Sequence, residues 1–188
     1  HLGLGFNYRD LQPNNQVRFS QASETNVSSV RIVDTDILTN VDTMLKSGLE
    51  FATVMGPFTA QAEYIRASVE RDNISDADFD GWYLQSSYLL TGESRPYKNG
   101  VFGGIKPNRR VGDGGIGAWE VAMRYSSLDL NDGAIEGGEA DSMTLGLNWY
   151  PVPMLRFSAN YVHVLDVDGG TFDGQEPDVF QVRSQWAF

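Results

Sequence analysis

Apolar and polar residues alternate in eight stretches of this chain, and this alternation is its strongest pattern. The first stretch intersperses glycine and polar residues with Leu2, Leu4, Phe6 and Tyr8. Successive side chains of a β-strand point to opposite faces, so the alternation predicts strands with one apolar and one polar face. The predicted strands span about residues 1–9, 48–56, 58–70, 80–91, 116–127, 140–150, 154–165 and 178–188.

The make-up of the two faces favours a membrane protein over a soluble one. The apolar faces carry Trp and Tyr toward strand ends, whereas the polar faces mix Arg, Glu, Gln and Asn with Gly and Ser. A tilted strand of roughly 9–11 residues can cross a bilayer, and aromatic girdles mark its two interfaces. We therefore predict an all-β fold, a transmembrane antiparallel β-barrel, with residues 1–188 forming part of one outer-membrane domain. A soluble ligand-binding β-sandwich is the alternative, and it would purify without detergent.

The connections between strands also differ in length. The turns at 56–57 and 151–153 are short, and strand parity places both on one side, as expected for the short periplasmic turns of outer-membrane barrels. The opposite connections 71–79, 128–139 and 166–177 are longer and polar. Two long loops, 10–47 on the external side and 91–115 on the periplasmic side, are expected to be functional. Because the chain begins within a strand pattern and no secretory signal precedes it, we expect a part of a longer protein.

Composition excludes several classes of function. The formal net charge of −11 opposes binding to nucleic acid, and the absence of Cys removes disulfides and thiolate metal sites. The sequence contains no recognisable nucleophile–base pair, phosphate-cradling glycine motif or metal triad. We therefore expect no catalytic residue, no cofactor and no metal, and a protein that is not an enzyme. The acidic external connections are interpreted as a hydrated rim, with binding of divalent cations as the alternative.

Basic residues gather away from that rim. The 91–115 loop and the polar strand faces supply the predicted pore-lining, anion-binding residues Arg95, Lys98, Lys106, Arg109, Arg110, Arg124, Arg156 and Arg183. Fixed cations in a narrow pore raise the local concentration of anions, and arginine can bind phosphate oxygens through two hydrogen bonds. The alternative is that these arginines pair with lumen acids such as Glu50, Glu63 and Glu120 and only stiffen the wall.

The last eight residues end on alternating aromatic side chains. Gln181, Trp186 and Phe188 fit the C-terminal signal that outer-membrane proteins present to the barrel assembly machinery, although Arg183 replaces the glycine of that signal. An edge strand with an aromatic outer face can pair with a template strand. We therefore expect the assembly machinery, outer-membrane lipid and lipopolysaccharide as partners.

Several stretches resemble the phosphate-selective porin O/P family, namely 90–98, 101–104, 117–130, 144–150, 156–163 and 179–188. The resemblance implies a homotrimer of 16-stranded barrels in the Gram-negative outer membrane, of which these eight strands are the C-terminal half. It also implies that 10–47 folds inward, with Arg18 and Arg31 as further lining candidates. The expected function is passive diffusion of small hydrophilic solutes, in particular anions such as phosphate. Since the acidic external loops would repel phosphate, a general or cation-tolerant porin and a non-conducting envelope barrel stay as alternatives.

Overall fold

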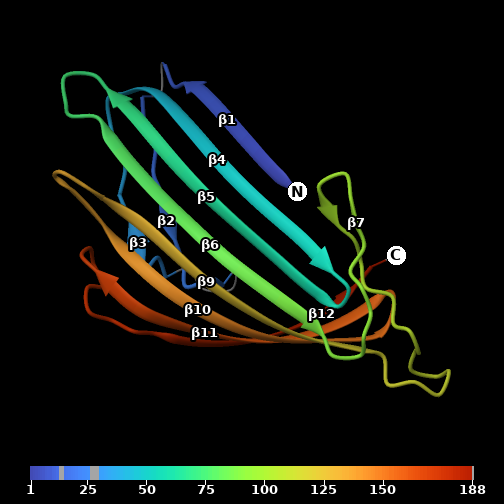
Figure 1. Ribbon diagram of the computed structural model, residues 1–188. Helices are drawn as coiled ribbons and strands as arrows, with labels where there is room; N and C mark the ends of the chain where they lie inside the picture. The colour runs from blue at the N-terminus through green and yellow to red at the C-terminus, as the bar shows by residue number, and fades with distance from the viewer. Residues whose placement is uncertain (13–14, 26–29, 188) are drawn as a thin grey trace.

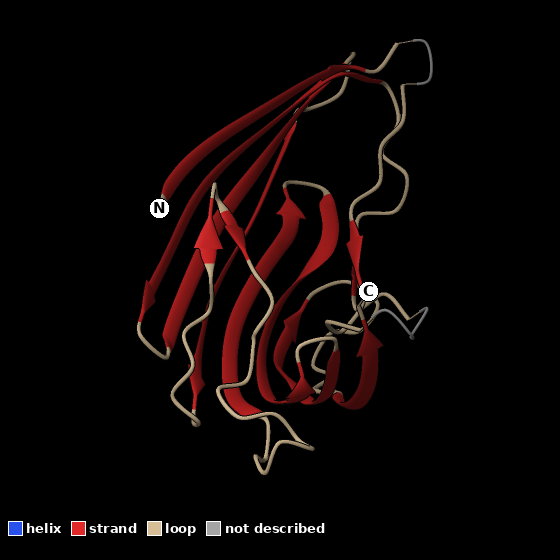
Figure 2. Cartoon of the chain, turned by 90° about the vertical axis from the view of Figure 1, so that its right-hand side faces the viewer, coloured by secondary structure: helices blue, strands red, loops and turns tan. Residues whose placement is uncertain are grey.

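One large curved sheet dominates the structure, a computed structural model that describes residues 1–12, 15–25 and 30–187. Eight antiparallel strands pair strictly with their neighbours in chain order, which confirms the all-β prediction. They are β1 (Leu2–Asp10), β4 (Val41–Met55), β5 (Phe58–Arg71), β6 (Ala77–Leu89), β9 (Ala118–Asp132), β10 (Ile135–Val152), β11 (Leu155–Asp168) and β12 (Asp178–Trp186). The sheet curls without closing, so β1 and β12 are its edges (Figures 1 and 2). No helix in the described ranges is long and apolar enough to cross a membrane.

Several strands run further than alternation predicts. β4 begins at Val41, so the external connection is 11–40 instead of 10–47. β9 and β10 meet at a two-residue turn, so most of the expected loop 128–139 is strand. Gly133 adopts φ +57°, and the Asn131 side chain accepts a hydrogen bond from the amide of Gly138 at 2.9 Å. Polar residues therefore continue the ladder of backbone hydrogen bonds beyond the apolar span.

The outer face of the sheet is apolar and open. Leu145 is 46% exposed, Phe157 40% and Trp186 64%, although all three are large apolar residues. Trp119, Trp149 and Phe157 stack in sequence on this face, with ring centroids 5.6 and 5.5 Å apart. Exposed apolar surface of this extent marks a face that meets lipid or another protein. The predicted division into an apolar outer face and a polar inner face is therefore present.

Two long connections cover the inner, concave face. The external connection 11–40 contains the short pair β2 (Ser20–Gln21) and β3 (Val33–Asp34), which lies behind the sheet in Figure 1. Its Ile32, Val33 and Leu38 pack into a buried cluster with Val69, Phe79, Leu130 and Val164. The periplasmic connection 90–117 contains β7 (Tyr97–Lys98) and β8 (Val101–Phe102), and its Ile105 packs with Leu89, Ala118 and Tyr150. Each connection therefore covers part of the concave face of the sheet, which we call the trough.

Candidate pore lining

A polar cavity of about 370 Å³ lies on the concave face between the two connections. Of the eight cations predicted to line the pore, three border this cavity: Arg95, Arg124 and Arg156. They come from the periplasmic connection, from β9 and from β11, so the fold brings together side chains that are far apart in the sequence. Other polar residues that border the cavity include Glu24, Glu120, Thr144 and Asn148.

Arg95 anchors the periplasmic connection through a buried ion pair. Its Nη2 lies 2.6 Å from Oε1 of Glu120, and the two side chains are 18% and 2% exposed. Tyr150 and Asn148 donate to the other carboxylate oxygen at 2.8 and 3.1 Å. Burial alone would lower the pKa of Arg95, but the Glu120 carboxylate outweighs this and raises the pKa above its ordinary value. For this arginine the wall-stiffening interpretation describes the geometry better than the anion-binding one.

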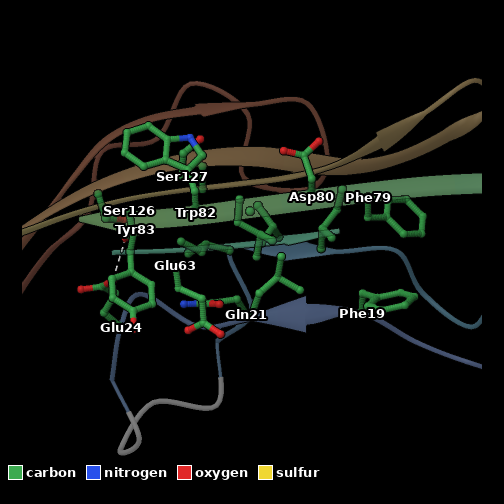
Figure 3. Close-up of a pocket in the computed structure, with 18 of the residues that line it drawn as sticks. Phe19, Gln21, Glu24, Glu63, Phe79, Asp80, Trp82, Tyr83, Ser126 and Ser127 are labelled. Carbon is green, nitrogen blue, oxygen red and sulfur yellow. Dashed lines mark hydrogen bonds between the residues drawn. The ribbon is translucent and has the colours of Figure 1, made fainter. Parts of the chain in front are cut away.

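Arg124 is paired with an acid that the sequence did not suggest. Its guanidinium lies 4.1 Å from the ring centroid of Tyr83, and its Nε is 3.0 Å from Oε1 of Glu24 in the external connection. The Glu24 carboxylate also accepts hydrogen bonds from Ser126 at 2.6 Å and Thr144 at 2.5 Å, and Figure 3 shows the bond to Ser126. Gln181 donates to the backbone oxygen of Glu24 at 3.1 Å. The external connection thus crosses the concave face as far as β12.

Arg156 has a neutral partner. Its Nε and Nη2 donate to Oδ1 of Asn148 at 3.2 and 2.8 Å, and its guanidinium lies 5.7 Å from the Tyr150 ring centroid. Within the described residues it forms no ion pair, in contrast to Arg95 and Arg124. Arg156 is therefore the arginine of this cavity whose positive charge is not offset by an adjacent carboxylate.

The other predicted cations lie outside the cavity. Lys98, Lys106, Arg109 and Arg183 are exposed, and Arg110 forms an exposed ion pair with Asp113 at 2.8 Å. Arg18 of the external connection bonds Asp34 at 2.7 and 2.5 Å, which stabilises the loop instead of leaving a free cation. Their contribution to a pore stays a prediction.

The proposed assembly signal divides between the two faces. Trp186 is exposed on the outer face, whereas Gln181 points inward to Glu24. Phe188 lies outside the described residues. The aromatic outer face of the last strand is therefore present, and its use as a signal stays a prediction.

Sequence reasoning missed two carboxylates that hold the connections. Glu24 lies in a polar stretch without periodicity, and its partners are about a hundred residues away. Glu93 is 4% exposed, accepts the amide of Asn108 at 2.9 Å and is hydrogen-bonded to Thr91. The Asn99-Gly100 pair, both with positive φ, was a usable signal for the β7–β8 hairpin.

An apolar sheet face turned outward and a polar face covered by inward-folding connections are typical of outer-membrane porins. The sequence model of the family phosphate-selective porin O and P matches residues 1–188. The chain therefore belongs to that family. Its place is accordingly the outer membrane of a Gram-negative bacterium.

Two relatives give the extent of the match. An uncharacterized protein of Caulobacter vibrioides is 35% identical over 173 residues, which cover 91% of this chain and 35% of the relative. Porin O of Pseudomonas aeruginosa is 37% identical over 158 residues, which cover 75% of this chain and 34% of the relative. The chain therefore spans about a third of the length of these relatives.

Proposed function

We propose that this chain forms part of a porin through which small hydrophilic anions such as phosphate diffuse passively. The observation that carries the proposal is the cavity on the concave face, where three arginines from separate elements meet. Cations fixed in a narrow polar passage concentrate anions and replace part of their hydration shell. Family membership indicates a channel and not an enzyme.

The barrel itself is proposed to contain 16 strands and to assemble as a homotrimer. The edges β1 and β12 each have one neighbour, and unpaired backbone groups at an edge are costly in lipid. An eight-stranded barrel has an interior that side chains fill, whereas about sixteen strands leave an aqueous channel. The greater length of the relatives supports further strands between these edges. Lipid, lipopolysaccharide and the assembly machinery remain the proposed partners.

A cation-tolerant porin is the second candidate, and the ion pairs favour it. Glu120 offsets Arg95 and Glu24 offsets Arg124, which leaves Arg156 to attract anions within the cavity. The net charge of −11 acts in the same direction.

Single-channel recordings of the full-length protein in planar bilayers test the proposal. Under a KCl gradient, we expect the sign of the zero-current potential to show that chloride permeates more readily than potassium. We also expect inorganic phosphate to block the chloride current. Cation preference without phosphate block would favour the second candidate. A folded protein that gives no conductance would favour a structural envelope barrel.

A further inference from the structure

The carboxylate of Glu24 sits in a ready-made site on the barrel wall. Ser126 and Thr144 donate hydroxyl hydrogen bonds to its two oxygens at 2.6 and 2.5 Å, and Arg124 lies 3.0 Å from Oε1. The donors belong to adjacent strands β9 and β10, so the sheet fixes their spacing independently of the connection that carries Glu24. Two hydroxyls that donate to a pair of carboxylate oxygens, with a guanidinium beside them, also suit the oxygens of a free oxyanion.

Arg124 retains hydrogen-bonding capacity in this arrangement. Its Nε is buried and has no hydrogen-bond partner among the described residues, although it lies within ion-pair distance of Glu24. The contact is therefore an attraction between charges without a well-directed hydrogen bond. Buried donors in proteins are nearly always satisfied, so this N–H is able to donate to a better-placed acceptor that takes the place of the Glu24 carboxylate.

Glu24 is held in an unfavourable backbone conformation at this site. Its φ is +45°, in the left-handed region that residues other than glycine rarely adopt. The rest of the external connection is fixed elsewhere, by the apolar cluster around Val33 and Phe79 and by the Arg18–Asp34 pair. The Glu24 carboxylate is therefore one of several contacts that hold the connection against the concave face, and the others remain when it is removed.

We propose that Arg124, Ser126 and Thr144 form an oxyanion-binding site, and that Glu24 is its tethered occupant. The inference rests on the proposed function, because it concerns the same concave face. The occupant cancels the charge of Arg124 and competes with any anion that reaches the wall. Glu24 thereby weakens phosphate binding at this point, so the passage holds anions less tightly than its arginines alone would.

Substitutions at Glu24 separate the charge of the occupant from the space that it fills. Glu24→Gln removes the charge and keeps the shape, whereas Glu24→Gly removes both and relieves the positive φ. Binding of inorganic phosphate to the full-length, detergent-solubilised protein is measured by calorimetry. We expect affinity to rise from wild type to Gln to Gly, by about tenfold at the last step, as for one charge-assisted hydrogen bond.

The matched controls are Asp36→Asn and Asp36→Gly. Asp36 lies in the same connection, also has a positive φ of 55°, and its side chain is 93% exposed. These variants should bind phosphate as wild type does, because they remove the same charge without opening the wall site. Adding Arg124→Gln to either Glu24 variant should return the affinity to the wild-type value.

Unchanged affinity in Glu24→Gly would overturn the proposal, as would a gain that persists without Arg124. Circular dichroism establishes whether each variant is folded. If Glu24→Gln does not fold, the comparison of wild type with Glu24→Gly alone tests the proposal. Current recordings on the same variants keep the two conclusions distinct. Conductance with no gain in affinity refutes the wall site alone, whereas a gain in affinity without conductance refutes the porin function alone.

Discussion

The two inward-folding connections are anchored by ion pairs of opposite polarity. The external connection contributes an acid, Glu24, to a cation on the wall, whereas the periplasmic connection contributes a cation, Arg95, to an acid on the wall. The exposed fractions of the side chains also differ: 34% and 12% for Arg124 and Glu24, but 18% and 2% for Arg95 and Glu120. In the proposed oxyanion site, an anion takes the place of Glu24, because the donors of the wall remain. An anion cannot take the place of Glu120 in the same way, because Glu120 itself belongs to the wall.

This difference indicates that the two ion pairs have different roles. At the periplasmic end, Glu120 accepts from three separate side chains and is inaccessible, which suits a fixed support. At the external anchor, the carboxylate is less deeply buried and its backbone is strained, which suits an exchangeable one. The arginines of a pore wall therefore cannot be counted as equivalent anion sites, since the partner of each decides whether it is available.

The largest expected effect follows from breaking the periplasmic anchor. Glu120→Gln leaves the Arg95 charge buried without a counter-ion, and removing one partner of a buried pair costs about 3–5 kcal/mol. The free energy of unfolding, measured by denaturant titration in detergent, should fall by that amount.

Two comparisons sharpen the result. Glu24→Gln should destabilise the protein much less, because both members of its pair are more exposed. The double variant Arg95→Gln, Glu120→Gln should lose less than the sum of the single losses, since the two side chains interact. Equal losses for the two anchors would contradict the distinction drawn between them.

A smaller effect, on binding instead of folding, is expected at Arg156. Arg156→Gln should raise the phosphate concentration that halves the chloride current by about tenfold, because the removed donor is charged and available. Arg124→Gln should change that concentration by less than about twofold, because Glu24 already occupies its site.

The cations outside the cavity provide the matched control. The triple change of Lys98, Arg109 and Arg110 to neutral residues should lower anion preference through a long-range field that high salt screens. It should leave half-block by phosphate near the wild-type value at high salt. A triple variant with unchanged ion selectivity at low salt would remove these residues from the pore altogether.

How far the sequence could predict this molecule depends on the range of each interaction. The strands follow from a period of two residues, which is local, so all eight were recognisable from Leu, Phe and Trp positions. The turn at Gly133 was missed because polar residues outside the membrane no longer alternate in hydrophobicity. In the same way, alternation predicts that this strand begins at 48, whereas β4 begins at Val41. The reason is that Val41 and Met44 face the inner cluster and not the lipid.

The site depends on contacts that no local pattern encodes. Arg124 and Arg156 were predicted correctly to lie on the polar faces of strands, yet their availability depends on Glu24 and Asn148. Glu24 is 102 residues from Ser126 and 120 from Thr144 along the chain. Its position follows only from how the external connection folds back over the sheet, where Val33 and Phe79 pack together.

The smallest expected effect is a dependence of the external connection on pH. The hydrogen bond from Arg18 holds the pKa of Asp34 below its ordinary value of 3.8, although partial burial acts against it. A carboxyl whose pKa is depressed in the folded state stabilises that state above its unfolded pKa, and the stabilisation is lost as pH falls through the folded one. Amide hydrogen exchange of residues 17–21 and 33–38 should therefore be constant from neutral pH to about 4 and, after correction for the intrinsic rate, should accelerate below that. Asp34→Asn should show weaker protection at neutral pH and lose the acidic step, whereas an unchanged step would assign it to other carboxylates.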